Sequence, residues 1–360
     1  MSNKKVVTNN IRSQKGTFKN LTAENISGGN IISNNAMLDT IVMNPVSIGI
    51  LAWQTGQNTN SVAIGTNTGQ INQGTSSIAI GFQAGQTNQA GNAVAVGNLA
   101  AGLNQSSDCV AVGNSAGANN QGGAFISIGV QSGKTNQGST AVAVGNQAGA
   151  MYQGGNGIAI GYLSGEYTQG SASVAIGASS GQTSQGVSSV AIGYLAAQCS
   201  QGTNSVAIGN SAGQTNQGIQ SVAVGVQSGQ TNQGFNCVAI GVQTAKINQG
   251  VGGVAIGANA AQYTQGSDSV AIGSLAGTAN QGSQSVAIGY KAGETEQGEY
   301  SVAIGSNAGK YQGEQSVAIG SSAAQYSQGS DSVAAGRLAG TANQGDKSVA
   351  IGHKKTYNFV

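Results

Sequence analysis

Proline, aromatic side chains and charge are scarce in this chain of 360 residues, and each scarcity excludes a class of protein. It has one proline beside 60 glycines, so collagen, which needs glycine at every third position and abundant proline, is excluded. Charged residues make up 7%, against about 25% in typical globular proteins. Disorder requires low hydrophobicity or high net charge. With 39% apolar residues and a net charge of +2, we expect the chain to fold.

The chain also lacks the features that mark nucleic-acid and membrane proteins. No stripe of lysine and arginine runs along it, so we expect no nucleic-acid partner. No stretch approaches 18 apolar residues, so no membrane insertion is predicted. The N-terminal sequence MSNKKVVTNN has no apolar segment of the secretory type.

Residues that carry chemistry are few and scattered. The cysteines lie far apart, without metal-ligand spacing, which favours small buried residues over a disulfide framework: Cys109, Cys199 and Cys237. The one histidine, His353, stands near the chain end beside two lysines, where a catalytic role lacks partners. Glu294, Glu296 and Glu299 are expected to be solvated; the alternative is that this acidic cluster binds calcium. We therefore predict no enzyme activity, no metal and no cofactor.

One 16-residue unit, with the consensus SVAIGxxAGQTNQGxx, recurs twenty times. Its SVAIG glycine stands at Gly49 and Gly65 and then at every sixteenth residue to Gly305; one unit is a residue short, giving Gly320. Repeats of paired helices need roughly 33 to 47 residues. Three apolar residues ended by glycine indicate instead a short strand followed by a bend. We predict an all-β parallel β-solenoid over residues 46–352, about 4.8 Å per coil and roughly 95 Å long.

Alternation along a strand assigns side chains to two faces. The valine and isoleucine of each unit share one face and are predicted to line the lumen, as at Val62, Ile64, Val206 and Ile208. The residue between them is alanine in eighteen units and serine in two. A position this strictly small indicates close packing, and a strand apolar on both faces is usually buried on both. We therefore predict that a second copy of the chain packs on this face, at Ala63, Ala79, Ala175 and Ala207.

The second strict position is a glutamine eight residues after the SVAIG glycine. Identical amides one coil apart form hydrogen-bonded ladders in stacked β-structures. We predict such a ladder along the axis, represented by Gln73, Gln89, Gln137, Gln217 and Gln233. The glycine that follows it, as at Gly74, is expected to bend the chain with a positive φ.

The SVAIGxxA unit with its glycine-containing turn resembles the head repeats of YadA-like trimeric autotransporter adhesins, over about residues 46–352. The resemblance implies a left-handed parallel β-roll, a parallel homotrimer and a role in adhesion. The unit is longer than is usual for the family, and no stalk or membrane β-barrel follows the last repeat. Similar repeats also occur in viral and phage fibre proteins, so we favour a fibre-type protein without the membrane anchor.

Three regions follow from these patterns. Residues 1–45 are expected to form an attachment or shaft-like segment that holds the chain on a virion or other scaffold. Residues 46–352 form the β-roll array, and residues 353–360 form a C-terminal cap or tail. The expected location is a virion surface or the extracellular space.

Recognition is expected at the variable positions, where aromatic residues such as Tyr162, Tyr194 and Tyr290 follow the SVAIG glycine. Exposed in rows, they would bind a host surface glycan or protein; irregular spacing favours instead the filling of gaps between subunits or coils. The leading function is a structural fibre or adhesin. Alternatives are an ice-binding β-solenoid, whose threonine array is interrupted by Ile71 and Tyr167, and a purely structural virion component.

Overall fold

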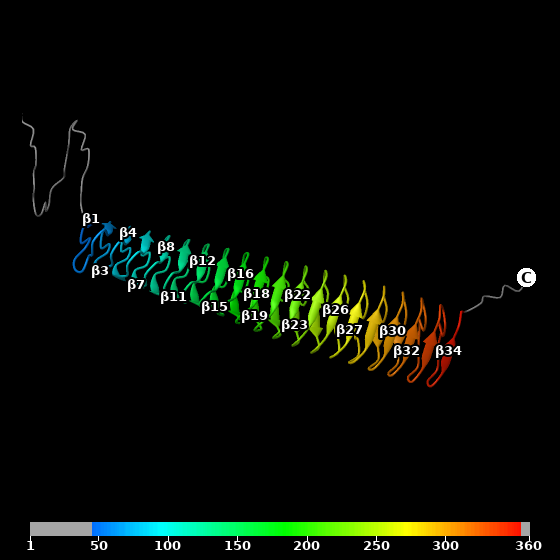
Figure 1. The fold of residues 1–360 in the computed structure, drawn as a ribbon. Coiled ribbons are helices and arrows are strands. Elements are labelled where there is room, and N and C mark those ends of the chain that lie inside the picture. The colour runs from blue at the N-terminus through cyan, green and yellow to red at the C-terminus, as the bar shows by residue number, and fades with distance from the viewer. Residues whose placement is uncertain (1–44, 354–360) are drawn as a thin grey trace, which may run out of the picture. The chain divides into compact units, whose positions relative to one another are not determined.

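The computed structural model describes residues 45–353, which form one stack of parallel β-coils (Figure 1). Each coil contributes one short strand to a 20-stranded sheet, here called sheet A. Most coils contribute a second strand to an opposite sheet, here called sheet B. No helix occurs within this described range. The segment proposed for attachment and the tail after His353 lie outside the described residues, apart from Pro45.

Sheet A contains the three-residue apolar strands that carry the SVAIG motif. They are β1 Val46–Ile48, β2 Val62–Ile64, β4 Ile78–Ile80, β6 Val94–Val96, β8 Val110–Val112, β10 Ile126–Ile128, β12 Val142–Val144, β14 Ile158–Ile160, β16 Val174–Ile176, β18 Val190–Ile192, β20 Val206–Ile208, β22 Val222–Val224, β24 Val238–Ile240, β26 Val254–Ile256, β27 Val270–Ile272, β28 Val286–Ile288, β30 Val302–Ile304, β32 Val317–Ile319, β33 Val333–Ala335 and β34 Val349–Ile351.

Sheet B is built from the segment that ends in the repeated glutamine. Twelve strands form one sheet: β3 Ile71–Gln73, β5 Thr87–Gln89, β7 Leu103–Gln105, β9 Asn119–Gln121, β11 Thr135–Gln137, β13 Met151–Gln153, β15 Tyr167–Gln169, β17 Thr183–Gln185, β19 Cys199–Gln201, β21 Thr215–Gln217, β23 Thr231–Gln233 and β25 Ile247–Gln249. The strands β29 Glu296–Gln297 and β31 Tyr311–Gln312 pair separately. Single bridges between successive glutamines, such as Gln265 to Gln281, continue this face between them.

Every strand pairs in parallel with its own copy in the next coil. In sheet A, Val62 is opposite Ile78 and Ala63 is opposite Ala79. In sheet B, Gln73 is opposite Gln89. Parallel pairing at a fixed 16-residue offset stacks identical positions about 4.8 Å apart, so the predicted β-solenoid is confirmed.

Glycine is required after each sheet A strand because the coils approach closely there. Gly65 has a φ of +131°, and a Cβ on it would lie 2.4 Å from the carbonyl oxygen of Gly81 in the next coil. Gly74 differs from its expected conformation, because its φ lies outside the left-handed region. A Cβ there would lie 2.4 Å from the backbone nitrogen of Gly91. Close packing between coils, rather than a positive φ, therefore selects glycine at position 74.

The interior is lined by small residues, and the expected orientation of the sheet A strands is wrong. The alanines assigned to a subunit contact, Ala63, Ala79, Ala175 and Ala207, are fully buried inside their own chain. The residues assigned to the lumen, Val62, Ile64, Val206 and Ile208, point outward and are half-buried or exposed. The physical reason is the short distance between sheet A and sheet B. Gln73 reaches from sheet B to the backbone of sheet A, so the gap between the sheets is no deeper than one glutamine side chain.

Phe125 is a large buried side chain among small ones, and its surroundings show how tightly the described interior is packed. It occupies a position where most coils have a buried serine, and it is itself fully buried. In the same coil Ser127 replaces alanine, and Gln121 donates to the carbonyls of Asn119 and Gly133 instead of crossing to sheet A. One large side chain is therefore accommodated only by rearranging its neighbours.

The shortened unit between Gly305 and Gly320 is absorbed on the sheet B side. Strand β31 has two residues instead of three, yet Gln312 remains opposite Gln297. In sheet A, Val317 remains opposite Val302. The deletion therefore leaves the long sheet in register.

Candidate interaction surfaces

The repeated glutamine ties the two sheets together from inside. Gln73 Nε2 donates to the carbonyl oxygen of Val62 at 2.8 Å, and Gln217 Nε2 makes the equivalent bond to Val206 at 2.8 Å. Both glutamine side chains are almost fully buried. The regular partner of this amide is thus a backbone carbonyl of sheet A.

The amide-to-amide ladder expected at this position is present only in segments. Gln73 donates to Gln89 at 3.3 Å, and Gln233 donates to Gln249 at 3.0 Å. Gln137 donates to Gln153. The amide of Gln217 bonds to backbone carbonyls and not to Gln233, whose Oε1 accepts no hydrogen bond among the described residues. In all but the end coils the glutamines form a buried structural network; Gln57 and Gln344, near the two ends of the stack, are partly exposed.

The outer face of sheet A is an uninterrupted apolar stripe. Valine and isoleucine from twenty successive strands project from it. Ile176, Ile208 and Ile240, for example, are each between 36% and 39% exposed. Monomeric soluble proteins rarely expose contiguous apolar patches of more than a few hundred Å², so this face is a candidate interaction surface.

The outer face of sheet B mixes polar and apolar residues and carries a ladder of exposed asparagines. Asn72 donates to Asn88 at 3.0 Å and Asn88 to Asn104 at 2.9 Å. A second run joins Asn216 to Asn232 at 3.1 Å. These asparagines have φ values near +54°, a left-handed conformation that asparagine tolerates better than most residues. The residue type therefore serves the backbone turn and the ladder together.

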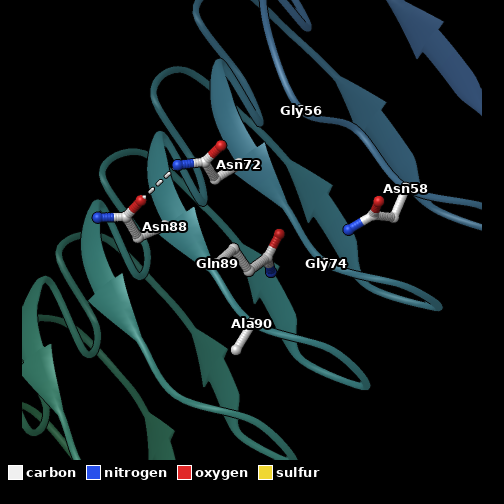
Figure 2. A pocket seen from close by; sticks show the side chains of 7 residues that line it. All are labelled: Gly56, Asn58, Asn72, Gly74, Asn88, Gln89 and Ala90. Carbon is white, nitrogen blue, oxygen red and sulfur yellow. Dashed lines mark hydrogen bonds between the residues drawn. The ribbon is translucent and has the colours of Figure 1, made fainter.

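A shallow groove runs beside this asparagine ladder. Figure 2 shows Asn72 and Asn88 joined along one wall, with Gly74, Gln89 and Ala90 nearby. A second stretch of the same kind is lined by Asn216, Asn232 and Phe235, among others. The grooves are open and present amide groups, and they contain no cluster of ionisable side chains.

The three tyrosines singled out for recognition are exposed. Tyr162, Tyr194 and Tyr290 show 56%, 56% and 51% of their surface, and all follow a sheet A strand at the same position of the coil. They do not fill gaps between coils of their own chain.

Near the shortened coil, Glu294 is paired with two lysines. Glu294 forms ion pairs with Lys291 at 3.1 Å and Lys310 at 3.2 Å. Hydrogen bonding to Glu294 raises the pKa of Lys291. Within residues 45–353, no three histidine, cysteine or acidic side chains come together in a way that would hold a metal ion.

Segments of the repeat array match a known family model. The model described as the YadA head domain repeat matches in two copies, at residues 200–212, 265–292 and 297–308. Over these segments the chain matches YadA head repeats. The matched segments include the sheet A strands β20, β27, β28 and β30, and the coils between and around them have the same register. No curated protein matches the chain.

YadA head repeats of this kind are adhesin-type modules and form an architecture that is not enzyme-like. No helix in the described part of the chain is long and apolar enough to cross a membrane. The sequence predicts the repeat and its strands, but it does not predict the outward apolar stripe or the asparagine ladder. The residues of both recur at fixed positions of the repeat, and only the structure shows which way their side chains point.

Proposed function

We propose that the protein is a structural fibre or adhesin that assembles as a parallel homotrimer through the valine and isoleucine stripe of sheet A. The observation that carries this proposal is the stripe itself, which runs over all twenty strands of the sheet. Burying the remaining exposed surface of its side chains at about 25 cal/mol per Å² favours association. The contact surface is therefore the Val/Ile face, in place of the alanine face expected from the sequence.

Three features support a parallel trimer. Adhesins with YadA head repeats, which this chain resembles, are trimeric. The stripe is continuous, so parallel copies around one axis bury it along its whole length. Closed rotational symmetry also leaves no unpaired copy of the surface, which prevents indefinite growth.

The finer functional role extends this assembly. A rigid trimeric rod at a virion or cell surface would hold its outward positions in fixed rows for attachment. Tyr162, Tyr194 and Tyr290 are exposed on the single chain but flank the stripe, so in the trimer they would contact a neighbouring subunit in preference to a host glycan or protein. Residues 1–45 would supply the link to the virion or other scaffold.

Light scattering on the full-length protein tests the assembly. The chain mass is 35.3 kDa, and a particle of three times that mass is expected. A stable monomer at micromolar concentration would overturn the proposal. A trimer that binds no cell surface and no glycan would leave a purely structural virion component as the function.

The ice-binding alternative gains no support from the outward positions of sheet B. Threonines such as Thr87 alternate irregularly with exposed Leu103, Met151 and Tyr167 along that face. A regular flat array is therefore absent from the described coils, and no thermal hysteresis is expected.

A further inference from the structure

Two rows of residues flank the apolar stripe. The residue types in these rows change from coil to coil, whereas those of the stripe hardly change. The leading row consists of the residue three positions before each sheet A strand, such as Phe235 before β24. The trailing row consists of the residue two positions after each strand, such as Val242 after β24. Both residues are exposed, at 56% and 52%. The trailing row lies at one edge of the stripe. The leading row lies at the other edge, in the turn from sheet B to sheet A, where Phe235 and Val251 also line the groove beside the asparagine ladder.

The leading row is polar or glycine except in one run of coils. There it holds Val187, Ile219, Phe235 and Val251, each between 44% and 56% exposed, with Thr203 between the first two. An isolated exposed apolar residue needs no explanation, but a run on neighbouring coils indicates a contact.

The trailing row matches this run coil by coil. The residues across the strand from the four apolar leading residues are Tyr194, Val226, Val242 and Ala258, in that order. Across from the polar Thr203 stands Asn210. Across from the leading residues Glu299 and Glu314 stand the small polar trailing residues Ser306 and Ser321. No large apolar trailing residue is opposite a charge in the described coils.

Large trailing residues outside the run stand opposite small leading ones. Val130 is across from Gly123, and Tyr162 is across from Gly155. Gly123 has no need to be glycine within its own chain: its φ lies outside the left-handed region, and a Cβ there would meet nothing within 4 Å. A bulky side chain from another copy explains why this position is empty.

The two rows do not meet within one chain. They lie at opposite ends of every strand, and because all strands are parallel, each row stays on its own edge of sheet A. In a parallel trimer with its axis along the stack, the leading edge of one subunit faces the trailing edge of the next at nearly the same height. Seven of sixteen residues separate the pair along the coil, which is about 2 Å of axial rise.

We propose that the leading row of one protomer packs against the trailing row of the next and fixes the axial register of the trimer, with Phe235 between Val226 and Val242 at the centre. This inference rests on the proposed parallel trimer. The Val/Ile stripe is nearly identical in every coil, so a slip of one coil leaves its contacts unchanged. The flanking rows are not periodic, and a slip would place side chains opposite the wrong partners.

Disulfide cross-linking tests this pairing. The background is Cys109→Ser, Cys237→Ser and Cys199→Thr, residue types that other coils have at these positions. Phe235→Cys combined with Val242→Cys is expected to give covalent dimers and closed trimers on a denaturing gel after oxidation. Disulfides require Cα atoms within about 7 Å, and the two positions lie on opposite edges of one chain, so the bonds formed are between chains.

Matched controls define register and symmetry. Phe235→Cys alone is expected to give no cross-link, because its neighbour is Val242 and not another Phe235. Phe235→Cys with Ser274→Cys, two coils farther along the trailing row, is also expected to give none. Cross-linking of the displaced pair as efficiently as the matched pair would overturn the register proposal.

A second measurement avoids dependence on disulfide geometry. Maleimide labelling of Phe235→Cys in the assembled trimer is expected to be lost relative to labelling of Asn232→Cys on the exposed ladder. If light scattering shows a trimer and both cysteines are fully labelled, the proposed contact between the two rows is wrong, while the proposed trimer is retained. A monomeric particle would overturn both proposals.

Discussion

The outer faces of the two sheets are built by the same coils, yet they differ in backbone geometry and in chemistry. In one coil, Ile208 projects from sheet A and Asn216 projects from sheet B. The first belongs to a stripe of nearly invariant aliphatic residues; the second belongs to an amide ladder broken by tyrosine, threonine and serine. A uniform apolar face favours a partner that is equally regular, whereas a variable, mixed face is compatible with solvent. The difference separates the proposed assembly face from the opposite face of the coil.

The largest expected effect comes from placing charge on the assembly face. Ile176→Glu, Ile208→Glu and Ile240→Glu together are expected to dissociate the trimer, because three carboxylates per chain would be buried without partners. Light scattering measures the mass. Thr183→Glu, Thr215→Glu and Thr231→Glu, on sheet B of neighbouring coils, are the matched control and are expected to leave the mass unchanged. Equal dissociation by both sets would mean that the two faces do not differ in the proposed way.

An interior substitution separates folding from assembly. Ala207→Val is expected to destabilise the solenoid by about 1–3 kcal/mol, because added methyl groups overpack a filled interior. Ala207→Ser is the control, since Ser127 occupies the same position in another coil and is fully buried. Denaturant unfolding compares the variants. An Ala207→Val protein that folds normally but fails to assemble would restore the orientation first expected from the sequence.

A third comparison lies within one strand of sheet B. Gln217→Leu is expected to cost about 1–3 kcal/mol, since it removes the buried amide that donates to the carbonyl of Val206 at 2.8 Å. Asn216→Ala, one residue away and exposed, is expected to change the free energy of unfolding by no more than about 0.5 kcal/mol. Denaturant unfolding of the two variants in the same buffer measures these changes. Similar losses of stability would contradict the inward direction of Gln217 and the outward direction of Asn216.

The smallest expected effect concerns the cysteines. Burial raises the pKa of the Cys109 and Cys237 thiols above the ordinary value of 9.0. As the pH rises past that value, the unfolded chain loses these protons first, so the free energy of unfolding falls. A Cys109→Ser, Cys237→Ser variant should lose this alkaline dependence in a pH series of unfolding curves. Half-buried Cys199 should be the first cysteine to react with a thiol reagent; faster labelling of the other two would contradict their interior placement.

The period, the strands and their parallel pairing could be predicted from the sequence because they depend on local chemistry and on repetition. Val62, Ala63 and Ile64 form a β-branched strand ended by glycine, and a sixteen-residue offset pairs each position with its copy. The strict glutamine indicated a buried role. Its main partner, the carbonyl oxygen of Val62, was not predictable, because backbone carbonyls are equally present everywhere in a sequence.

The sequence by itself determined that each strand has two distinct faces, one aliphatic and one strictly small. Only the tertiary structure decided which face points inward. Ranking by hydrophobicity favours burying Val62 and Ile64 within the chain, but a coil of sixteen residues closes around a gap that Ala63 and Gln73 already fill. Size overrides hydrophobicity in so narrow an interior, and the aliphatic residues are left outside as the surface on which copies of the chain are proposed to meet.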